Sequence, residues 1–355
     1  MILICLAYIL LQILLFSAIK RFFRHNSSST TGAGISVVTA ARNESSSIKE
    51  FIGAIKKIKY PESNFELIIS DDNSSDDTYE VAEQEIRGYI NFKLTGNHKS
   101  PAAGKRDALL RGITESSFPF IVITDADCIP SPGWLRRCSG LFEEGYDFIY
   151  GPAPFYKENN LVNYISCMEN LKNQFLSFSL AALGFPYTAA ARNMGFSREA
   201  FARIGGYRNT RQTIGGDDDL LLREAVKNGL KVKAFYDRNA FVYSKSKDTL
   251  KEYLKQKARH TKTSFHYLLR NKIILGAWHL LNFAMFFSVF LLFINLNFVW
   301  FFIVKMISDT VILLSIQKKF GYDFKIIEII YLNIFYELFI VINFYNALFK
   351  KPKWK

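Results

Sequence analysis

Two aspartates separated by one alanine are the residues that most directly suggest chemistry in this sequence. The apolar run at 118–124 ends at Asp125, Ala126 and Asp127. If the run is a buried strand, both carboxylates lie at its C-terminal end, where their oxygen atoms can bind a divalent cation beside a nucleotide. Aspartate is also common in solvated turns, and so short a pattern is compatible with that interpretation too.

Five further motifs occur in order around this pair. They are ISVVTAARNES at 35–45, FELIISDDNSSDDT at 65–78, AARNMGF at 190–196, GGDDDLLLR at 215–223 and QKARH at 256–260. Each is weak alone, but as an ordered set with the aspartate pair they resemble glycosyltransferase family 2 across residues 35–265. The resemblance implies an α/β fold of GT-A type, with an open, mostly parallel sheet flanked by helices. It also implies inverting transfer of a sugar from a nucleotide-sugar donor.

The resemblance further implies a divalent cation, Mg²⁺ or Mn²⁺, as the cofactor. Asp127, assisted by Asp125, would bind it and so neutralise the diphosphate as it departs. Carboxylate oxygens favour such hard cations on physical grounds as well. Lys105 follows a glycine at a predicted helix start, which suits a contact to phosphate. An ordinary solvated lysine is the alternative at that position.

The ends of the first two predicted strands supply three more candidate donor-binding residues. Arg42 and Glu44 follow the first strand, and Asp72 follows the second. Asp72 lies in DDNSSD, which is similar to the family segment whose second aspartate contacts the nucleoside. Residues of this segment can also cap the next helix, a role that suits Ser75 and Asp76. The two roles are compatible.

Three adjacent acids in GGDDDLLLR are the candidates for a general base. Because neighbouring carboxylates repel one another, at least one should bind a proton more tightly than usual. The resemblance maps the base, which accepts the proton of the attacking hydroxyl, onto Asp218. Asp217 stands where the family more often has glutamate, and Asp219 could be aligned to the same place as Asp218. Favourable charge at a helix start is the alternative, and it explains two acids better than three.

Two motifs are assigned by resemblance to the acceptor side. QKARH resembles the family's QxxRW element, with His260 in place of tryptophan. Arg259 would contact the diphosphate through its fork of donors, with Gln256 and His260 toward the acceptor. The missing tryptophan weakens the case for processive polymer synthesis, and a basic interfacial helix is the alternative for this segment. ARNMGF resembles the family's acceptor-side strand, which implicates Arg192 and Asn193.

Short apolar runs between the motifs predict the strands that position them. Five runs lack polar alternation and therefore indicate buried parallel strands, at 35–39, 65–70, 90–94, 120–124 and 148–151. Apolar residues at helical spacing from 48 to 58 predict a helix that covers the sheet, and helices are expected after Asp76, Gly104 and Pro132. Such an alternation of strands and helices predicts ligands outside the carboxyl ends of the strands.

Long apolar segments near both ends predict a membrane protein. The first nineteen residues carry no charge and run into Lys20, Arg21 and Arg24. This predicts a membrane anchor followed by a cytosolic domain, whereas a signal peptide would normally show a basic start and a cleavage site. The runs at 276–294 and 296–316 flank Asn295 and predict a hairpin across the bilayer. The run at 324–349 could span, re-enter or lie along the interface, and the sequence leaves this open.

Two polar features lie close to these segments. Residues 161–183 predict an amphipathic helix under the catalytic domain rather than a span. Lys305 and Asp309 are four residues apart in the second C-terminal run, so they are expected to pair on one helix face. An acid inside a membrane is also a functional candidate.

The net charge of +13 indicates a partner of opposite charge. Basic residues gather at 245–272 beside the apolar runs, which favours anionic lipid headgroups and not nucleic acid. The predicted protein is therefore an integral enzyme of the bacterial inner membrane that uses a lipid-linked or membrane-delivered acceptor. A processive polysaccharide synthase is one alternative, and a non-catalytic transporter or scaffold with a degenerate nucleotide-sugar-binding domain is another.

The predicted domain organisation has five parts. They are an N-terminal anchor (1–20), a linker (21–34), the GT-A catalytic domain (35–245), a basic interfacial helix (246–272) and C-terminal membrane helices (273–350).

Overall fold

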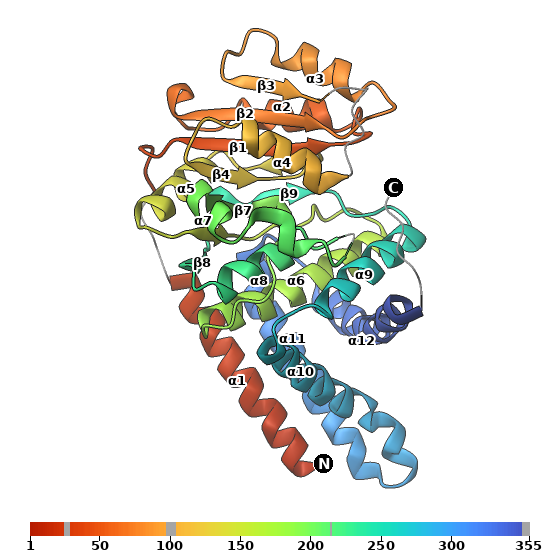
Figure 1. The fold of residues 1–355 in the computed structure, drawn as a ribbon. Helices are drawn as coiled ribbons and strands as arrows, with labels where there is room; N and C mark the ends of the chain where they lie inside the picture. Colours follow the sequence, from red (N-terminus) through yellow and green to blue (C-terminus); the bar gives the residue numbers. More distant parts are fainter. Residues whose placement is uncertain (25–28, 97–103, 214, 350–355) are drawn as a thin grey trace.

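A sheet with its helices forms one part of the molecule, and long helices from both ends of the chain form the other (Figure 1). The computed structural model describes residues 1–24, 29–96, 104–213 and 215–349. The basic tail at 350–355 and part of the predicted linker, residues 25–28, lie outside the described residues.

The central sheet has the strand order β3-β2-β1-β4-β7-β6-β8 within the described residues. β7 runs antiparallel to β4 and β6, and the other neighbouring strands are parallel. The five predicted strands are therefore confirmed as parallel members of one sheet. β3 begins at Phe92 because Ile90 lies in a turn with 99% of its surface exposed. The strands are β1 (Ile35–Ala41), β2 (Phe65–Asp71), β3 (Phe92–Thr95), β4 (Phe120–Ile123), β6 (Phe148–Tyr150), β7 (Met194–Ser197) and β8 (Val232–Ala234).

Helices cover both faces of this sheet. Successive side chains of a strand point to opposite faces, so Val37 and Val38 of β1 belong to different hydrophobic cores. The core around Val37 includes residues of α2 (Ile48–Ile55), α3 (Thr78–Ile86) and α5 (Trp134–Glu143). The core around Val38 includes α4 (Lys105–Glu115), α6 (Leu161–Ala182), α7 (Arg198–Arg203) and α8 (Asp219–Lys227). The helices predicted from the sequence at 48–58 and after Asp76, Gly104 and Pro132 are confirmed.

A second, small sheet lies beside the carboxyl end of β4. β5 (Cys128–Pro130) and β9 (Val242–Ser244) pair antiparallel. β5 begins directly after the aspartate pair, so the chain turns sharply where the two acids stand.

Four helices of the described chain are long and apolar enough to span a membrane, namely Ile2–Arg24, Leu269–Phe293, Leu296–Phe320 and Ile326–Phe349. They contain α1 (Ile2–Arg24), α10 (Leu269–Phe287), α11 (Val299–Ile316) and α12 (Ile326–Phe349). The C-terminal run left open by the sequence thus has the length and composition of a span. α1 continues past residue 20, and α10 begins before residue 273, so both helices extend beyond the predicted segment boundaries.

The predicted hairpin and the predicted amphipathic helix are both present. α10 packs against α11, and the Asn295 side chain accepts the backbone N–H of Asn297 at 2.9 Å in the turn between them. α6 packs against α1 and β8, so it lies between the sheet and the long helices (Figure 1). α9 (Leu250–Ser264) packs against α6 and α12.

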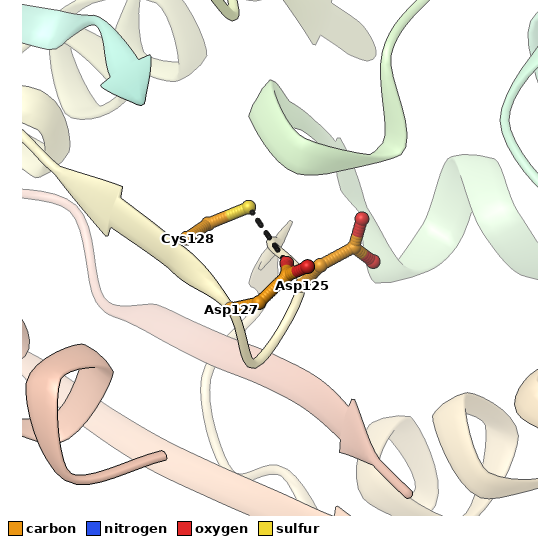
Figure 2. Close-up of side chains that lie close together, drawn as sticks. All are labelled: Asp125, Asp127 and Cys128. Atoms are coloured by element: carbon orange, nitrogen blue, oxygen red, sulfur yellow. Dashed lines mark hydrogen bonds between the residues drawn. The ribbon is translucent and has the colours of Figure 1, made fainter. Parts of the chain in front are cut away.

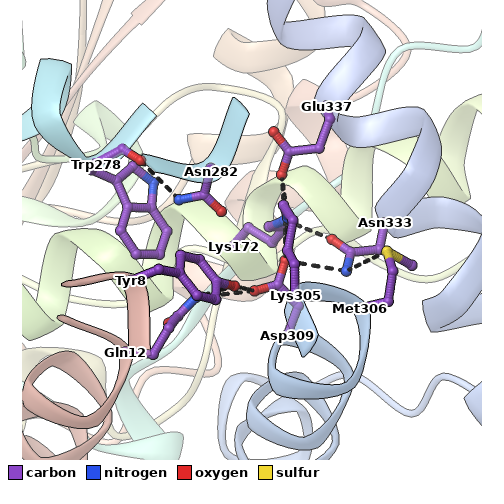
Figure 3. Close-up of polar contacts among 10 residues, drawn as sticks. All are labelled: Tyr8, Gln12, Lys172, Trp278, Asn282, Lys305, Met306, Asp309, Asn333 and Glu337. Carbon is purple, nitrogen blue, oxygen red and sulfur yellow. Dashed lines mark hydrogen bonds and ion pairs between the residues drawn. The ribbon is translucent and has the colours of Figure 1, made fainter. Parts of the chain in front are cut away.

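A buried polar network joins the long helices (Figure 3). Lys305 Nζ donates to Asp309 Oδ2 at 2.7 Å, which confirms the predicted pair, and to Glu337 Oε1 on α12 at 2.9 Å. Lys172 of α6 lies 3.4 Å from the same Glu337 oxygen. The Tyr8 hydroxyl of α1 donates to Asp309 Oδ1 at 2.7 Å. The two cations and two carboxylates balance, and this offsets part of the cost of burying them.

Candidate active site

Two sharp turns after β1 and β2 place the first donor-side candidates. Asn43 and Asn73 both have a φ of 55°, a left-handed conformation that asparagine tolerates. Asn43 Oδ1 accepts the backbone N–H of Ser75 at 2.8 Å, which ties the two turns together. Asp71 accepts from the backbone N–H of Ser74 at 3.1 Å and therefore stabilises its own turn.

Asp72 is buried at the end of β2 with one carboxylate oxygen available. Only 2% of its surface is exposed, and Arg42 lies 3.6 Å from its Oδ2. Its Oδ1 has no hydrogen-bond partner among the described residues. Burial raises the pKa of Asp72, and Arg42 opposes that shift. A buried, unpartnered acceptor is costly, so this oxygen is suited to a ligand donor.

Glu44 follows β1 as predicted, and its contacts are with the starts of two helices. Its Oε2 accepts from the Ser47 hydroxyl at 2.8 Å, and its backbone N–H donates to Thr78 at 2.8 Å. Glu44 therefore holds the start of α2 and the neighbouring start of α3 together.

Asp125, Asp127 and Cys128 form the candidate metal site (Figure 2). One potential ligand atom from each lies within 4.8 Å of the others. Cys128 Sγ is directed at Asp127 Oδ1 at 3.4 Å. Burial, followed by the neighbouring carboxylates, raises the pKa of Cys128 well above its ordinary value. The two carboxylates offer oxygen ligands of the kind that hard divalent cations prefer.

Lys105 connects this site to the acidic segment. Its Nζ lies 2.7 Å from Asp125 Oδ1 and 3.1 Å from Asp217 Oδ2. Although burial opposes the charge, the two carboxylates hold the pKa of Lys105 well above its ordinary value. The next residue, Arg106, donates to the Thr213 carbonyl at 2.7 Å and to the Gly215 carbonyl. The first turn of α4 thus holds the acidic segment against the aspartate pair.

The three acids of that segment have three different environments. Despite burial, Lys105 and Arg106 hold the pKa of Asp217 below its ordinary value. Asp218 accepts two backbone N–H groups, those of Ala191 at 3.0 Å and Asp219 at 2.8 Å. Burial and the charge on Asp217 raise the pKa of Asp218.

Asp219 is surrounded by hydrogen-bond donors. Its Oδ1 accepts from the Thr188 hydroxyl at 2.6 Å and the Ala189 N–H at 3.2 Å, and its Oδ2 accepts from the Tyr267 hydroxyl at 2.5 Å. Burial and the neighbouring Asp218 nevertheless raise the pKa of Asp219 to about 8. Both of its oxygens accept hydrogen bonds, two of them from side-chain hydroxyls, whereas each oxygen of Asp218 accepts one backbone N–H.

α9 brings QKARH to the acidic segment. The Arg259 side chain lies against Gly215, where a Cβ would meet Arg259 Cγ at 3.1 Å. His260 is exposed and Gln256 is half-buried on the same helix. Lys257 lies 2.9 Å from Glu169, and this ion pair fixes α9 to α6.

Arg192 and Asn193 mainly support the surrounding backbone. Asn193 is 1% exposed, accepts from Trp134 Nε1 at 2.9 Å and donates to the carbonyls of Pro152 and Ala240 at 2.8 and 3.0 Å. Its amide is therefore satisfied inside the protein, and the expected contact with an acceptor finds no support in this position. Arg192 donates to the Ser244 hydroxyl and the Ala153 carbonyl and stacks over the Phe155 ring.

Comparison with known proteins supports the fold and the resemblance of the motifs to one family. The sequence profile of Glycosyl transferase family 2 matches residues 36–205, which is just under half of the chain. Mannosyltransferase PcManGT from Pyrobaculum calidifontis, solved in complex with GDP-Man and Mn²⁺, is 15% identical with a TM-score of 0.61, and the match covers 99% of this chain and 98% of that one. This similarity confirms the GT-A type fold.

Two curated relatives match a shorter region of the chain. Glycosyltransferase AglE of Haloferax volcanii is 30% identical over 126 residues, which is 35% of this chain and 41% of the relative. The GalNAc(5)-diNAcBac-PP-undecaprenol beta-1,3-glucosyltransferase of Campylobacter jejuni is 33% identical over 111 residues, or 30% of this chain and 35% of the relative. The chain thus spans less than half the length of either relative.

The candidate site contains residues that the sequence did not single out. Arg106, Thr188 and Tyr267 all contact the acidic segment. Arg106 had one available signal, since it directly follows Lys105 at a helix start. Thr188 and Tyr267 are single polar residues in apolar surroundings, and they reach Asp219 only through the folding of distant segments.

Proposed function

We propose that this protein is a family 2 glycosyltransferase that transfers a sugar, with inversion, from a nucleotide-sugar donor to a lipid-linked acceptor at a membrane. The observation that carries the proposal is the Lys105 bridge. It joins the aspartate pair at the end of β4 to the acidic segment at the start of α8. A donor diphosphate and an acceptor hydroxyl would therefore meet between these two groups of acids.

The donor side of this site is formed by the ends of β2 and β4. Asp125 and Asp127 would hold Mg²⁺ or Mn²⁺, which when bound neutralises charge on the departing diphosphate. The Mn²⁺ in the PcManGT complex supports this assignment. Asp72, with its unpartnered Oδ1, would accept a hydrogen bond from the nucleoside. Lys105 and Arg259 would supply positive charge to the phosphates.

The acceptor step requires a base on the other side of the sugar. The acceptor hydroxyl oxygen attacks the anomeric carbon, and the bond from that carbon to the diphosphate oxygen breaks with its electron pair going to the diphosphate. Asp218 takes the hydroxyl proton. One displacement of this kind inverts the anomeric configuration. The raised pKa of Asp218 suits it to accept a proton, and its neighbours are each occupied, Asp217 by Lys105 and Asp219 by three donors.

The long helices supply the membrane side of the proposal. The Campylobacter jejuni relative is named for an undecaprenol-linked substrate, and the candidate spans would place such a lipid near the site. Lys20, Arg21 and Arg24 favour a cytosolic catalytic domain, in keeping with the bacterial inner membrane. His260 and Gln256 on α9 remain the proposed acceptor-side residues, and Arg42 a donor-side residue. We keep the domain organisation predicted from the sequence as a proposal, with the anchor helix extended to Arg24 and the C-terminal helices beginning at Leu269.

A donor screen tests the proposal. The protein is purified in detergent and incubated with Mn²⁺, a panel of UDP- and GDP-sugars and a bacterial lipid extract, and nucleoside diphosphate release and labelled glycolipid are measured. We expect at least one donor to be consumed with label entering the lipid phase, and Asp127→Asn to lose this activity. A wild-type protein that neither binds nor consumes any donor of the panel would overturn the proposal.

A further inference from the structure

Asp219 is held by two segments that are far apart in the sequence. Thr188 and Ala189 belong to the connection between α6 and β7, and they bind one carboxylate oxygen. Tyr267 lies between α9 and α10, and its hydroxyl binds the other oxygen at 2.5 Å. One side chain beside the proposed base therefore links the two segments.

Asp218 and Asp219 both bind the connection between α6 and β7. Asp218 accepts the N–H of Ala191, and Asp219 accepts from Thr188 and Ala189, which are three and two residues earlier in the chain. The proposed base thus cannot shift relative to this connection without breaking hydrogen bonds on both acids. The acidic segment and residues 188–191 behave as one unit.

Tyr267 attaches that unit to the start of a candidate membrane span. α10 begins at Leu269, and Asn271 in its first turn donates to the Pro186 carbonyl at 3.4 Å. The Tyr187 ring packs edge-on against the Tyr267 ring with centroids 5.8 Å apart. The junction between the basic helix α9 and the span therefore contacts Asp219 through Tyr267, and it contacts the connection at Pro186 and Tyr187.

We propose that Asp219 is a positioning residue that, through Tyr267, fixes the height of the base Asp218 above the membrane end of α10. This role rests on the proposed function. A lipid-linked hydroxyl is presented at a height set by the bilayer, so its reaction depends on where α10 holds the base. Water reaches Asp218 from solution at any height, and hydrolysis of the donor should not depend on the link.

The variant that tests the link is Tyr267→Phe, which removes one hydroxyl and keeps the ring that packs against Tyr187. We expect transfer to the lipid extract to fall about 10-fold, since small misplacement of a reacting group is costly. Donor hydrolysis by water and the KM for the donor should stay within about twofold. Thr188→Val, which removes one of the two donors to the other carboxylate oxygen, should shift the same ratio of transfer to hydrolysis. Tyr187→Phe, a matched loss of a neighbouring hydroxyl, should behave as wild type.

Equal losses of transfer and hydrolysis in Tyr267→Phe would overturn the positioning role, because a merely structural link affects both. Unchanged transfer would overturn it as well. Hydrogen exchange of residues 186–191 gives a readout without activity. We expect faster exchange in Tyr267→Phe than in Tyr187→Phe. Equal exchange in the two variants would show that the Tyr267 hydroxyl does not hold this segment. If the wild type transfers no sugar, the proposed function fails, and the positioning role falls with it even where exchange confirms the contact.

Discussion

Lys105 is the residue at which the two halves of the site meet. It lies within 3.1 Å of carboxylates on both sides, one from the aspartate pair after β4 and one from the segment before α8. The positive charge of its ammonium group offsets the repulsion between these two carboxylates. The same position suits a cation that stabilises negative charge on a leaving diphosphate.

The proposed metal dependence of transfer can be tested at individual residues. Asp127→Ala should abolish transfer, and chelation of the wild type should do so until Mn²⁺ or Mg²⁺ is restored, because the two carboxylates are the hard ligands of the site. Cys128→Ser is the control. Its sulfur is a buried thiol, so this variant should keep the Mn²⁺ dependence of the wild type. Full wild-type activity in excess chelator would remove the metal from the account.

Asp219 predicts a pH dependence of stability. Its pKa is about 8 in the folded protein, above the ordinary value of 3.8, so the folded state binds this proton more tightly than the unfolded state. The contribution of this group to the free energy of unfolding is fully present below about pH 4, and it is lost as the pH rises through about 8. Asp219→Asn cannot titrate, and its melting temperature should therefore fall less than that of the wild type between pH 6 and 9.

The matched control for this experiment is Asp248→Asn, which removes an exposed carboxylate. Its melting temperature should follow that of the wild type across the same range. Parallel curves for Asp219→Asn and the wild type would show that Asp219 does not carry the shifted proton.

Residues at strand ends were the ones that the sequence could locate. Asp125 and Asp127 follow a buried run directly, so their position follows from the strand itself. Asn193 shows the opposite case, because a polar residue within a motif has the same appearance whether it faces a ligand or is enclosed by Trp134 and two carbonyls. The contacts of Asp219 with Thr188 and Tyr267 depend on side-chain directions in distant segments, which one sequence does not encode visibly.

At the scale of elements, strand length decided what could be predicted. β1 and β2 are seven residues each and mostly apolar, and both were predicted at the correct place. β5, β8 and β9 are three residues each, too short to form a periodic pattern, and their pairing depends on the rest of the fold. The long helices were predicted from composition. Of their polar contacts, the sequence predicted only the pair of Lys305 and Asp309 within α11.

The network between the long helices makes a prediction at this scale. Lys305→Met leaves Asp309 and Glu337 with only the more distant Lys172, and removing one partner of a buried ion pair costs about 3–5 kcal/mol. Tyr8→Phe should cost less, about 1–3 kcal/mol, because it removes one hydrogen bond to Asp309. Unfolding in detergent with increasing denaturant measures both.

Tyr345→Phe provides the control for these variants, since Tyr345 is an exposed residue of α12. It should unfold as the wild type does. A Lys305→Met protein as stable as this control would show that the buried charges do not hold the helices together.

At the scale of the whole molecule, the N-terminal helix packs with helices from the C-terminal part of the chain. α1 packs against α6, α10 and α11 (Figure 1). The basic residues at the end of α1 and along α9 lie toward the sheet domain, which would place that domain and the anionic lipid surface on the same side.

This arrangement predicts the topology. Reporters fused within residues 29–34 and after Lys247 should both report the cytosol, whereas a reporter inserted at Asn295 in the hairpin turn should report the opposite side. Cysteine labelling of intact cells at the same positions checks the fusions. Labelling of the 29–34 segment from outside would reverse the orientation and remove the supply of cytosolic donor.

The central claim is that Asp218 removes the acceptor's proton at a site where the donor is held by the strand ends. The most direct test compares the wild type with Asp218→Asn, which keeps the size of the side chain, removes the accepting charge and replaces one of its two hydrogen-bond acceptors with an amide donor. With labelled donor, Mn²⁺ and the lipid extract, transfer should fall by at least about 100-fold, while donor affinity measured by titration stays within about twofold. Transfer by Asp218→Asn close to the wild-type rate, with equal donor affinity, would contradict the account.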